Sequence, residues 1–190
     1  MKYLFPTPHT DVKTMVFVDG ENLAIRYGDE LKRQGKLPIP QMRYMENVYV
    51  WSQRFHNLLV QQCKPIRTYY YTSVQGDSVK IDTVIDDLRA MKVEHPSVFQ
   101  KKKGSGSKQV DISLATDMLV HASHRNYETA VLVAGDEDYV PLVRAVENEG
   151  RRVVVWFLDN GLSPKLKQAA DFYADLSEFL FTEVVYGLGE

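Results

Sequence analysis

Short apolar runs alternate along most of the chain with segments in which apolar residues recur every three or four positions. The runs have the length of buried strands, and the spacing between them is that of amphipathic helices. Runs that are apolar throughout indicate strands covered on both faces, as in parallel sheets. The pattern therefore predicts an α/β fold with three layers (αβα), a mostly parallel central sheet and right-handed crossovers. The expected strands lie at 15–18, 66–71, 98–100, 131–134, 153–158 and 172–173, and the expected helices at 23–34, 42–62, 77–91, 110–122, 141–150 and 164–170, with a fragment near 179.

The composition limits the chain to one domain and narrows its possible partners. It has 190 residues, of which 44% are hydrophobic, enough for one well-buried core. A net charge of −2 excludes a surface that binds polyanions everywhere, so such a partner needs a local patch or a bound cation. The single cysteine, Cys63, excludes a disulfide framework. Without a signal-like start or an apolar run of membrane length, we expect a cytoplasmic protein with no membrane partner.

Carboxylates follow two of the apolar runs at the point where each expected strand ends. Asp19 comes directly after 15–18, and Asp136 and Asp138 follow 131–134. The carboxyl ends of parallel strands share one edge of a sheet. If the two strands are neighbours, these acids face a common crevice.

Two further aspartates lie in the helix that precedes the 131–134 run. Six residues separate Asp111 from Asp117, a spacing that does not place both on one stripe of a regular helix. Asp111 is expected at the mouth of the helix and Asp117 deeper, among apolar neighbours. There a carboxylate needs a cation, a hydrogen-bond donor or an exposed rotamer.

Several carboxylates in one crevice repel one another. Two unit charges about 4 Å apart interact by roughly 4 kcal/mol at an effective dielectric constant of about 20, so protons or a divalent cation must compensate. Ligands that are all oxygen favour Mg²⁺ or Mn²⁺ over zinc. Such an ion can orient a water and stabilise charge on a phosphoryl group, which indicates phosphodiester hydrolysis. The expected metal ligands are Asp19, Asp111, Asp136 and Asp138.

Three sequence blocks together resemble the NYN domain of the PIN-like nuclease superfamily, and within it the bacterial LabA-like (DUF88) branch. The blocks are 17–23 (FVDGENL), 108–117 (KQVDISLATD) and 134–143 (AGDEDYVPLV), in the family's order. The resemblance covers about residues 14–180. It implies an NYN domain at 14–180, an N-terminal extension at 1–13 and a C-terminal tail at 181–190.

The resemblance implies a Rossmann-like PIN fold and a Mg²⁺- or Mn²⁺-dependent endoribonuclease that acts on single-stranded or structured RNA. Gln109 stands where the family often has glycine. Glu137 occupies a position usually filled by a small residue, and it either adds a ligand or points away. The implied site consists of the catalytic residues Asp19, Asp111, Asp117, Asp136 and Asp138, with Asn22 ordering them.

Basic residues offer a candidate track for RNA. A lysine-rich segment of low complexity feeds directly into Asp111. Such a segment is often only a solvated turn, but here it would overhang the acidic crevice, hold phosphates and make binding salt-dependent. Arginines on the preceding helices either extend this track or serve solubility alone. The lysines are Lys101, Lys102, Lys103 and Lys108, and the arginines are Arg26, Arg43 and Arg54.

Other interpretations stay open beside the nuclease. Asp19 is also a candidate helix N-cap, and Asp136 with Asp138 a candidate Asx-type turn. One alternative is a regulatory module that has the same fold and binds RNA, a nucleotide or a protein at the same crevice, but catalyses no reaction. A Toprim-type metal site would leave Asp111 and Asp117 unexplained.

Aromatic and histidine residues allow further alternatives. Tyr69–Tyr71 are expected to be buried in a strand rather than to stack on bases, and His121 and His124 to be surface or capping residues. An aromatic set in the 42–62 segment belongs either to the core or to a homodimer face. Its members are Tyr44, Tyr49, Trp51 and Phe55.

Overall fold

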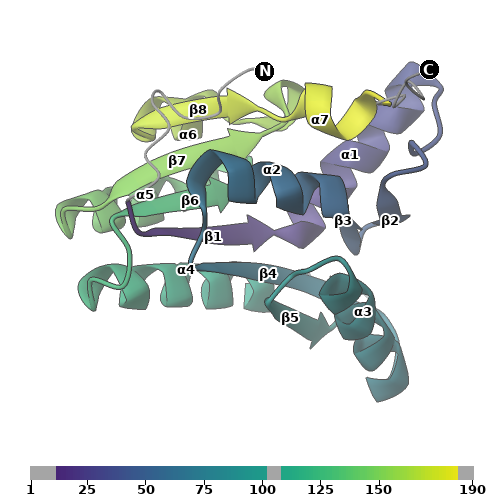
Figure 1. Cartoon of the computed structure of the whole chain (residues 1–190), viewed down its shortest axis with the longest axis horizontal. Helices are drawn as coiled ribbons and strands as arrows, with labels where there is room; N and C mark the ends of the chain where they lie inside the picture. The colour runs from purple at the N-terminus through teal and green to yellow at the C-terminus, as the bar shows by residue number, and fades with distance from the viewer. Residues whose placement is uncertain (1–11, 102–107, 184–190) are drawn as a thin grey trace, which may run out of the picture.

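Six parallel strands form the central sheet in the order β5-β4-β1-β6-β7-β8 (Figure 1). The computed structural model describes residues 12–101 and 108–183. Most of the predicted N-terminal extension and C-terminal tail lies outside the described residues, as do Lys102 and Lys103, and the domain boundaries stay predictions. The strands are β1 (Thr14–Asp19), β4 (Arg67–Val74), β5 (His95–Gln100), β6 (Thr129–Val133), β7 (Arg152–Phe157) and β8 (Phe172–Asp175).

Helices cover both faces of this sheet. The chain runs from β1 to β4 and β5 in one direction and then returns through β6, β7 and β8 in the other, so right-handed crossovers place the two sets of helices on opposite faces. None of the described helices has the length and apolar character needed to cross a bilayer. One face carries α1 (Gly20–Gln34), α2 (Gln53–Cys63), α3 (Ser78–Ala90), α7 (Ser177–Phe181) and a hairpin of β2 (Arg43–Met45) and β3 (Tyr49–Trp51), and the other α4 (Lys108–Ser123), α5 (Val140–Asn148) and α6 (Pro164–Ala169). The predicted three-layer α/β fold is confirmed.

The central strands are buried because both of their faces are covered. Every residue of β1 and β6 is buried, which explains why their sequences are apolar runs rather than alternating patterns. In β4, Tyr69 stacks on Phe17 with ring centroids 5.4 Å apart, whereas the Tyr70 hydroxyl donates to the Val50 carbonyl of the hairpin on the other face. Tyr69–Tyr71 are all buried, so strand burial is confirmed and base stacking is not their role.

The helix predicted for 42–62 is wrong in its first half. Residues 43–51 form the β2–β3 hairpin, and the helix begins only at Gln53. Asn47 takes a left-handed conformation (φ 57°) in the turn, and Ser52 caps α2 by accepting from the Phe55 amide at 3.0 Å. Tyr49, Trp51 and Phe55 are buried in the core, which removes them from a homodimer face.

Two glycines of α1 differ in the space around them, which makes a matched pair for a stability test. A Cβ at Gly20 would lie 1.9 Å from Cε1 of the fully buried Tyr70, whereas one at Gly28 would meet the hydroxyl of half-buried Tyr44 at 2.2 Å. Alanine gains about 1 kcal/mol of helix propensity at either position. We expect Gly20→Ala to destabilise the protein by about 1–3 kcal/mol, because Tyr70 has no room to move.

In the same experiment, Gly28→Ala should stay within about 1 kcal/mol of wild type, since the end of the Tyr44 side chain can shift. Urea unfolding followed by circular dichroism measures both variants. Equal losses of stability would contradict the packing described here.

Candidate functional site

The candidate site lies where β1 and β6 end. These strands are parallel neighbours, with Val18 paired to Val133, so Asp19 and the segment after Val133 leave the sheet at the same edge. The strand order also reverses at this point, since β4 flanks β1 on one side and β6 on the other. Open α/β sheets bind ligands at such a switch point.

Asp19 is both the last residue of β1 and the N-cap of α1. Its Oδ1 accepts a hydrogen bond from the Asn22 amide at 2.9 Å, and its Oδ2 accepts one from the Tyr139 hydroxyl at 2.9 Å. Its side chain is almost completely buried. The capping interpretation and the site interpretation of Asp19 are therefore compatible, because each uses a different oxygen.

Asn22 connects α1 to the segment that follows β6. Its Oδ1 accepts from the Gly135 amide at 3.1 Å, and its Nδ2 donates to Oδ2 of Asp136 at 2.8 Å. The side chain amide therefore holds Asp136 beside the start of α1.

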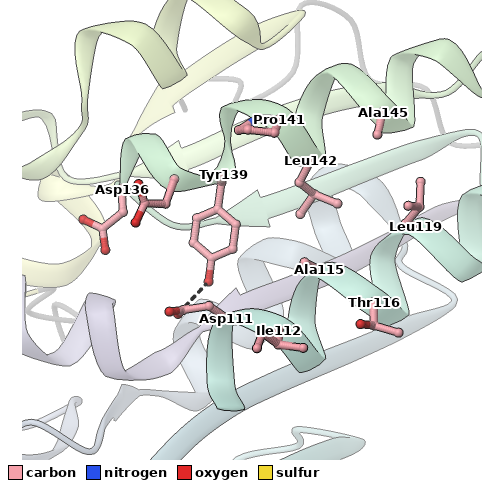
Figure 2. Close-up of a pocket in the computed structure, with 11 residues that line it drawn as sticks. Asp111, Ile112, Ala115, Thr116, Leu119, Asp136, Tyr139, Pro141, Leu142 and Ala145 are labelled. Atoms are coloured by element: carbon pink, nitrogen blue, oxygen red, sulfur yellow. Dashed lines mark hydrogen bonds between the residues drawn. The ribbon is translucent and has the colours of Figure 1, made fainter. Parts of the chain in front are cut away.

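Tyr139 lies between two carboxylates, and sequence reasoning gave it no role. It belongs to the short 3₁₀ helix η1 (Glu137–Tyr139), and its hydroxyl is 2.9 Å from Asp19 Oδ2 and 3.3 Å from Asp111 Oδ1. Figure 2 marks the hydrogen bond to Asp111. A phenol has one proton and can donate it to only one acceptor at a time. The hydroxyl thus offsets only part of the repulsion. The sequence signal that could have identified Tyr139 is its position directly after the two acids at 136 and 138.

The carboxylates of the site affect one another's protonation. Burial raises the pKa of Asp19 from 3.8 to about 7, helped by the charges of Asp111 and Asp136 and opposed by the bonds from Asn22 and Tyr139. Burial and the neighbouring acids, Asp138 among them, also raise the pKa of Asp111. Burial and the two adjacent carboxylates raise the pKa of Tyr139, so this phenol remains a donor at every physiological pH.

A pocket of about 480 Å³ opens from this cluster and runs between α4 and α5 (Figure 2). Asp111, Asp136 and Asp138 lie at its acidic end. Its walls further along are mostly apolar. They include Ile112, Ala115 and Leu119 of α4 and Pro141, Leu142 and Ala145 of α5.

Glu21 is a buried acid beside the site that sequence reasoning also missed. Its carboxylate accepts a hydrogen bond from Ser73 and forms an ion pair with Lys101. Lys101 therefore has an intramolecular partner, while the side chain of Lys108 is exposed at the start of α4. Contact of either lysine with RNA stays a prediction.

Asp117 and Glu137 lie apart from the pocket's acidic end. The Tyr71 hydroxyl donates to Oδ2 of Asp117 at 2.8 Å, which supplies the donor that this carboxylate needs and holds α4 against β4. Glu137 forms an ion pair with Lys165 of α6 at 3.2 Å. The structure thus brings together Asp19, Asn22, Asp111, Asp136 and Asp138 with Tyr139 and places Asp117 on a different contact.

The chemistry of these side chains fits a hard divalent cation. In the described ranges, no three or more His, Cys, Asp and Glu side chains form a ready-made metal site, and the Tyr139 hydroxyl occupies the gap between Asp19 and Asp111. The donors are nevertheless all oxygen, and the pKa of Asp19 is raised by its burial and, to a smaller extent, by the charges of Asp111 and Asp136. Mg²⁺ and Mn²⁺ prefer such oxygen ligands.

Asp19 should make the stability of the metal-free protein depend on pH. Its pKa is about 7 in the folded state and near 3.8 in the unfolded chain, so the folded state binds more protons between these values. The free energy of unfolding therefore falls as the pH rises from about 4 to 7, by up to roughly 4 kcal/mol at about 1.4 kcal/mol per pKa unit. Asp19→Asn should flatten this dependence, as measured by urea unfolding in EDTA across that range.

Added Mg²⁺ or Mn²⁺ should raise the melting temperature of the wild type more at pH 8 than at pH 5.5, because protons compete for the same oxygens. Asp82→Asn, at an exposed position on α3, serves as the control and should behave like wild type. Identical pH profiles for wild type and Asp19→Asn would refute the raised pKa.

Tyr139→Phe should destabilise the metal-free protein at pH 8 by about 1–3 kcal/mol, because it removes the hydrogen-bond donor that lies between buried Asp19 and Asp111. A bound divalent cation should recover most of that loss. Tyr71→Phe is the matched control, since it removes the donor to Asp117 instead, and metal should not recover its loss. Denaturant unfolding of both variants with EDTA and with Mn²⁺ makes the comparison, and equal recovery would speak against a metal at the Asp19 cluster.

Comparisons with known proteins identify the fold and the family. A crystal structure of a protein of unknown function from Vibrio parahaemolyticus RIMD 2210633 shares the fold, with a TM-score of 0.67 and 18% identity over 92% of this chain and 98% of that chain. An uncharacterized protein of Methanocaldococcus jannaschii is 29% identical over 80 residues, 42% of this chain, and the chain spans about a third (32%) of that relative's length. The NYN domain family matches residues 13–177, which include all six strands of the sheet and the carboxylate cluster. The chain therefore belongs to the NYN domain family and has its PIN-like nuclease fold.

Proposed function

We propose that this protein is a Mg²⁺- or Mn²⁺-dependent ribonuclease of the LabA-like branch that hydrolyses phosphodiester bonds of RNA. The observation that carries the proposal is that Asp19 and Asp111 converge on the Tyr139 hydroxyl while Asn22 holds Asp136 beside them, at the mouth of an open pocket. Buried Cys63, the single cysteine, supports a reducing, cytoplasmic setting.

In this mechanism Asp19, Asp111, Asp136 and Asp138 are the residues that would hold the metal. When bound, the ion lowers the pKa of a water and stabilises charge on the phosphoryl oxygens. Asn22 keeps Asp136 oriented through its Nδ2, as it does in the unliganded site. Asp111 and Asp138, which line the pocket, would complete the ligand shell of the metal or position the attacking water.

The shape of the pocket favours a nucleic acid over a small phosphate compound. Beyond the acidic end, the groove between α4 and α5 has apolar walls, and the exposed side chain of Ile112 lies along it. An apolar slot beside carboxylates suits a nucleobase attached to the phosphodiester under attack. Asp117 contributes indirectly, since its bond to Tyr71 holds α4 and hence Asp111 against the sheet.

A second candidate is a module that binds RNA, a nucleotide or a protein at the same crevice without turnover. One observation favours it: the Tyr139 hydroxyl already occupies the gap between Asp19 and Asp111.

If the protein is the proposed nuclease, it should cleave labelled single-stranded RNA in the presence of Mn²⁺ or Mg²⁺, as measured on denaturing gels. Asp19→Asn and Asp136→Asn should each lower the rate by about 100-fold or more, because each removes a charged metal ligand. Asp117→Asn should cost less than about tenfold, since that residue acts only through the position of α4.

Asp82→Asn, purified in the same way, controls for contaminating nucleases and should keep full activity. Cleavage that survives both Asp19→Asn and Asp136→Asn would remove the nuclease assignment. Tight RNA binding without product over hours would favour the non-catalytic module.

A further inference from the structure

A second, smaller pocket of about 290 Å³ lies on the other side of Asp136, and Arg26 lines it. Arg26 follows Asn22 by one turn of α1, so the two side chains project from the same face of the helix. Asn22 contacts Asp136 directly, and Arg26 reaches the same region from one turn further along. The rest of the pocket comes from the loops that follow β6 and β7, through Gly135, Glu137, Asn160, Gly161 and Ser163.

Arg26 is an arginine without a partner. Its side chain forms no hydrogen bond or ion pair with the described residues, and its Nε is buried and unsatisfied. Three other arginines of this face have partners: Arg33 pairs with Glu30, Arg43 with Asp87, and Arg54 donates to the Thr182 carbonyl. A guanidinium carries five donors, and leaving a buried one unpaired costs free energy. The unused donors of Arg26 indicate a ligand.

The surroundings of Arg26 are fixed rather than loose. A Cβ at Gly161 would lie 3.1 Å from Cγ and 3.2 Å from Cδ of Arg26, so the glycine makes room for the arginine stem. Asn160 donates to Glu30 of α1, and the Ser163 amide donates to the Gly135 carbonyl at 2.8 Å. These bonds hold the loops after β6 and β7 against each other and against α1.

The charges around this pocket balance in the protein itself, and Arg26 is in surplus once a metal takes up the charge of Asp136. Glu137 is paired with Lys165 at the rim, and the Asp136 carboxylate is held by Asn22 and belongs to the proposed metal cluster. The Arg26 guanidinium would bind one anionic group, and a metal at Asp136 would bind the anionic group next to it. On a chain with a net charge of −2, such a local cation is what an RNA strand requires.

We propose that Arg26 is a phosphate-binding residue that grips the phosphodiester next to the scissile one, on the side of Asp136 remote from the α4–α5 groove. This inference rests on the proposed function, because it takes the ligand to be the backbone of single-stranded RNA. The RNA strand then crosses the Asp cluster, with a base in the apolar groove and the neighbouring phosphate in the Arg26 pocket. Since phosphate contacts carry no sequence information, Arg26 contributes affinity and register rather than base preference.

The test compares Arg26→Met with wild type for binding of a short fluorescein-labelled single-stranded RNA. Anisotropy titrations are run in Ca²⁺ at several salt concentrations, and gels confirm that the RNA stays intact. Arg26→Met should weaken binding by about tenfold or more, and the slope of log affinity against log salt should fall by about 0.7, the value for one phosphate contact on a single strand. Arg26→Lys should fall between the two, because it keeps the charge but loses the fork.

Arg89→Met is the matched control, since it removes the same charge from an exposed position on α3 and should bind as wild type does. A structural role for Arg26 would instead show in stability. The melting temperature of Arg26→Met should equal or exceed that of wild type, because the substitution removes an unpaired buried donor.

Either of two binding results would overturn the inference: no RNA binding by the wild type, or wild-type affinity and salt slope in Arg26→Met. RNA cleavage by the wild type with an unchanged KM in Arg26→Met would refute the role of Arg26 and leave the nuclease intact. Arg26-dependent binding without any cleavage would refute the nuclease and leave the phosphate site intact.

Discussion

Parallel pairing of β1 with β6 determines where negative charge gathers in this protein. The two strands lie side by side at the centre of the sheet, and both end at the edge where the strand order reverses. Asp19 and Asp136 therefore reach one crevice from positions far apart in the sequence, and α4 adds Asp111 from the face beside it. Carboxylates placed this close repel one another. Within the protein, the Tyr139 proton and the Asn22 amide reduce this repulsion, and the raised pKa of Asp19 favours its uncharged form.

The two pockets on either side of Asp136 have opposite character, and this gives the site a direction. One is a mostly apolar groove between α4 and α5, and the other is a small pocket with an unpaired guanidinium. A nucleotide has the same division between an apolar base and an anionic phosphate. The two pockets are thus better matched to a nucleic-acid strand that crosses this edge of the sheet than to a compact ligand in one cavity.

The sequence predicted the features that depend on local pattern. Uniform apolar runs at 15–18 and 131–134 identified two buried strands, and parallel topology then placed Asp19 near Asp136. Periodicity failed at 42–62, because aromatic residues three and four apart also suit a hairpin followed by a helix. The bridging position of Tyr139 was beyond reach, since it depends on three segments meeting, and Arg26 looked like one of several solubilising arginines until the partners of the others were known.

Asp19 is both the N-cap of α1 and a carboxylate of the candidate site. These two roles bear on how related proteins could lose the proposed nuclease activity. Asparagine caps a helix about as well as aspartate. Exchanging one for the other at this position would remove the charge while α1 still begins at the same residue. In the proposed nuclease, a single nucleotide change would therefore abolish the activity without preventing folding. If related proteins nevertheless keep aspartate at this position, selection acts on the charge of the carboxylate and not on the capping of α1.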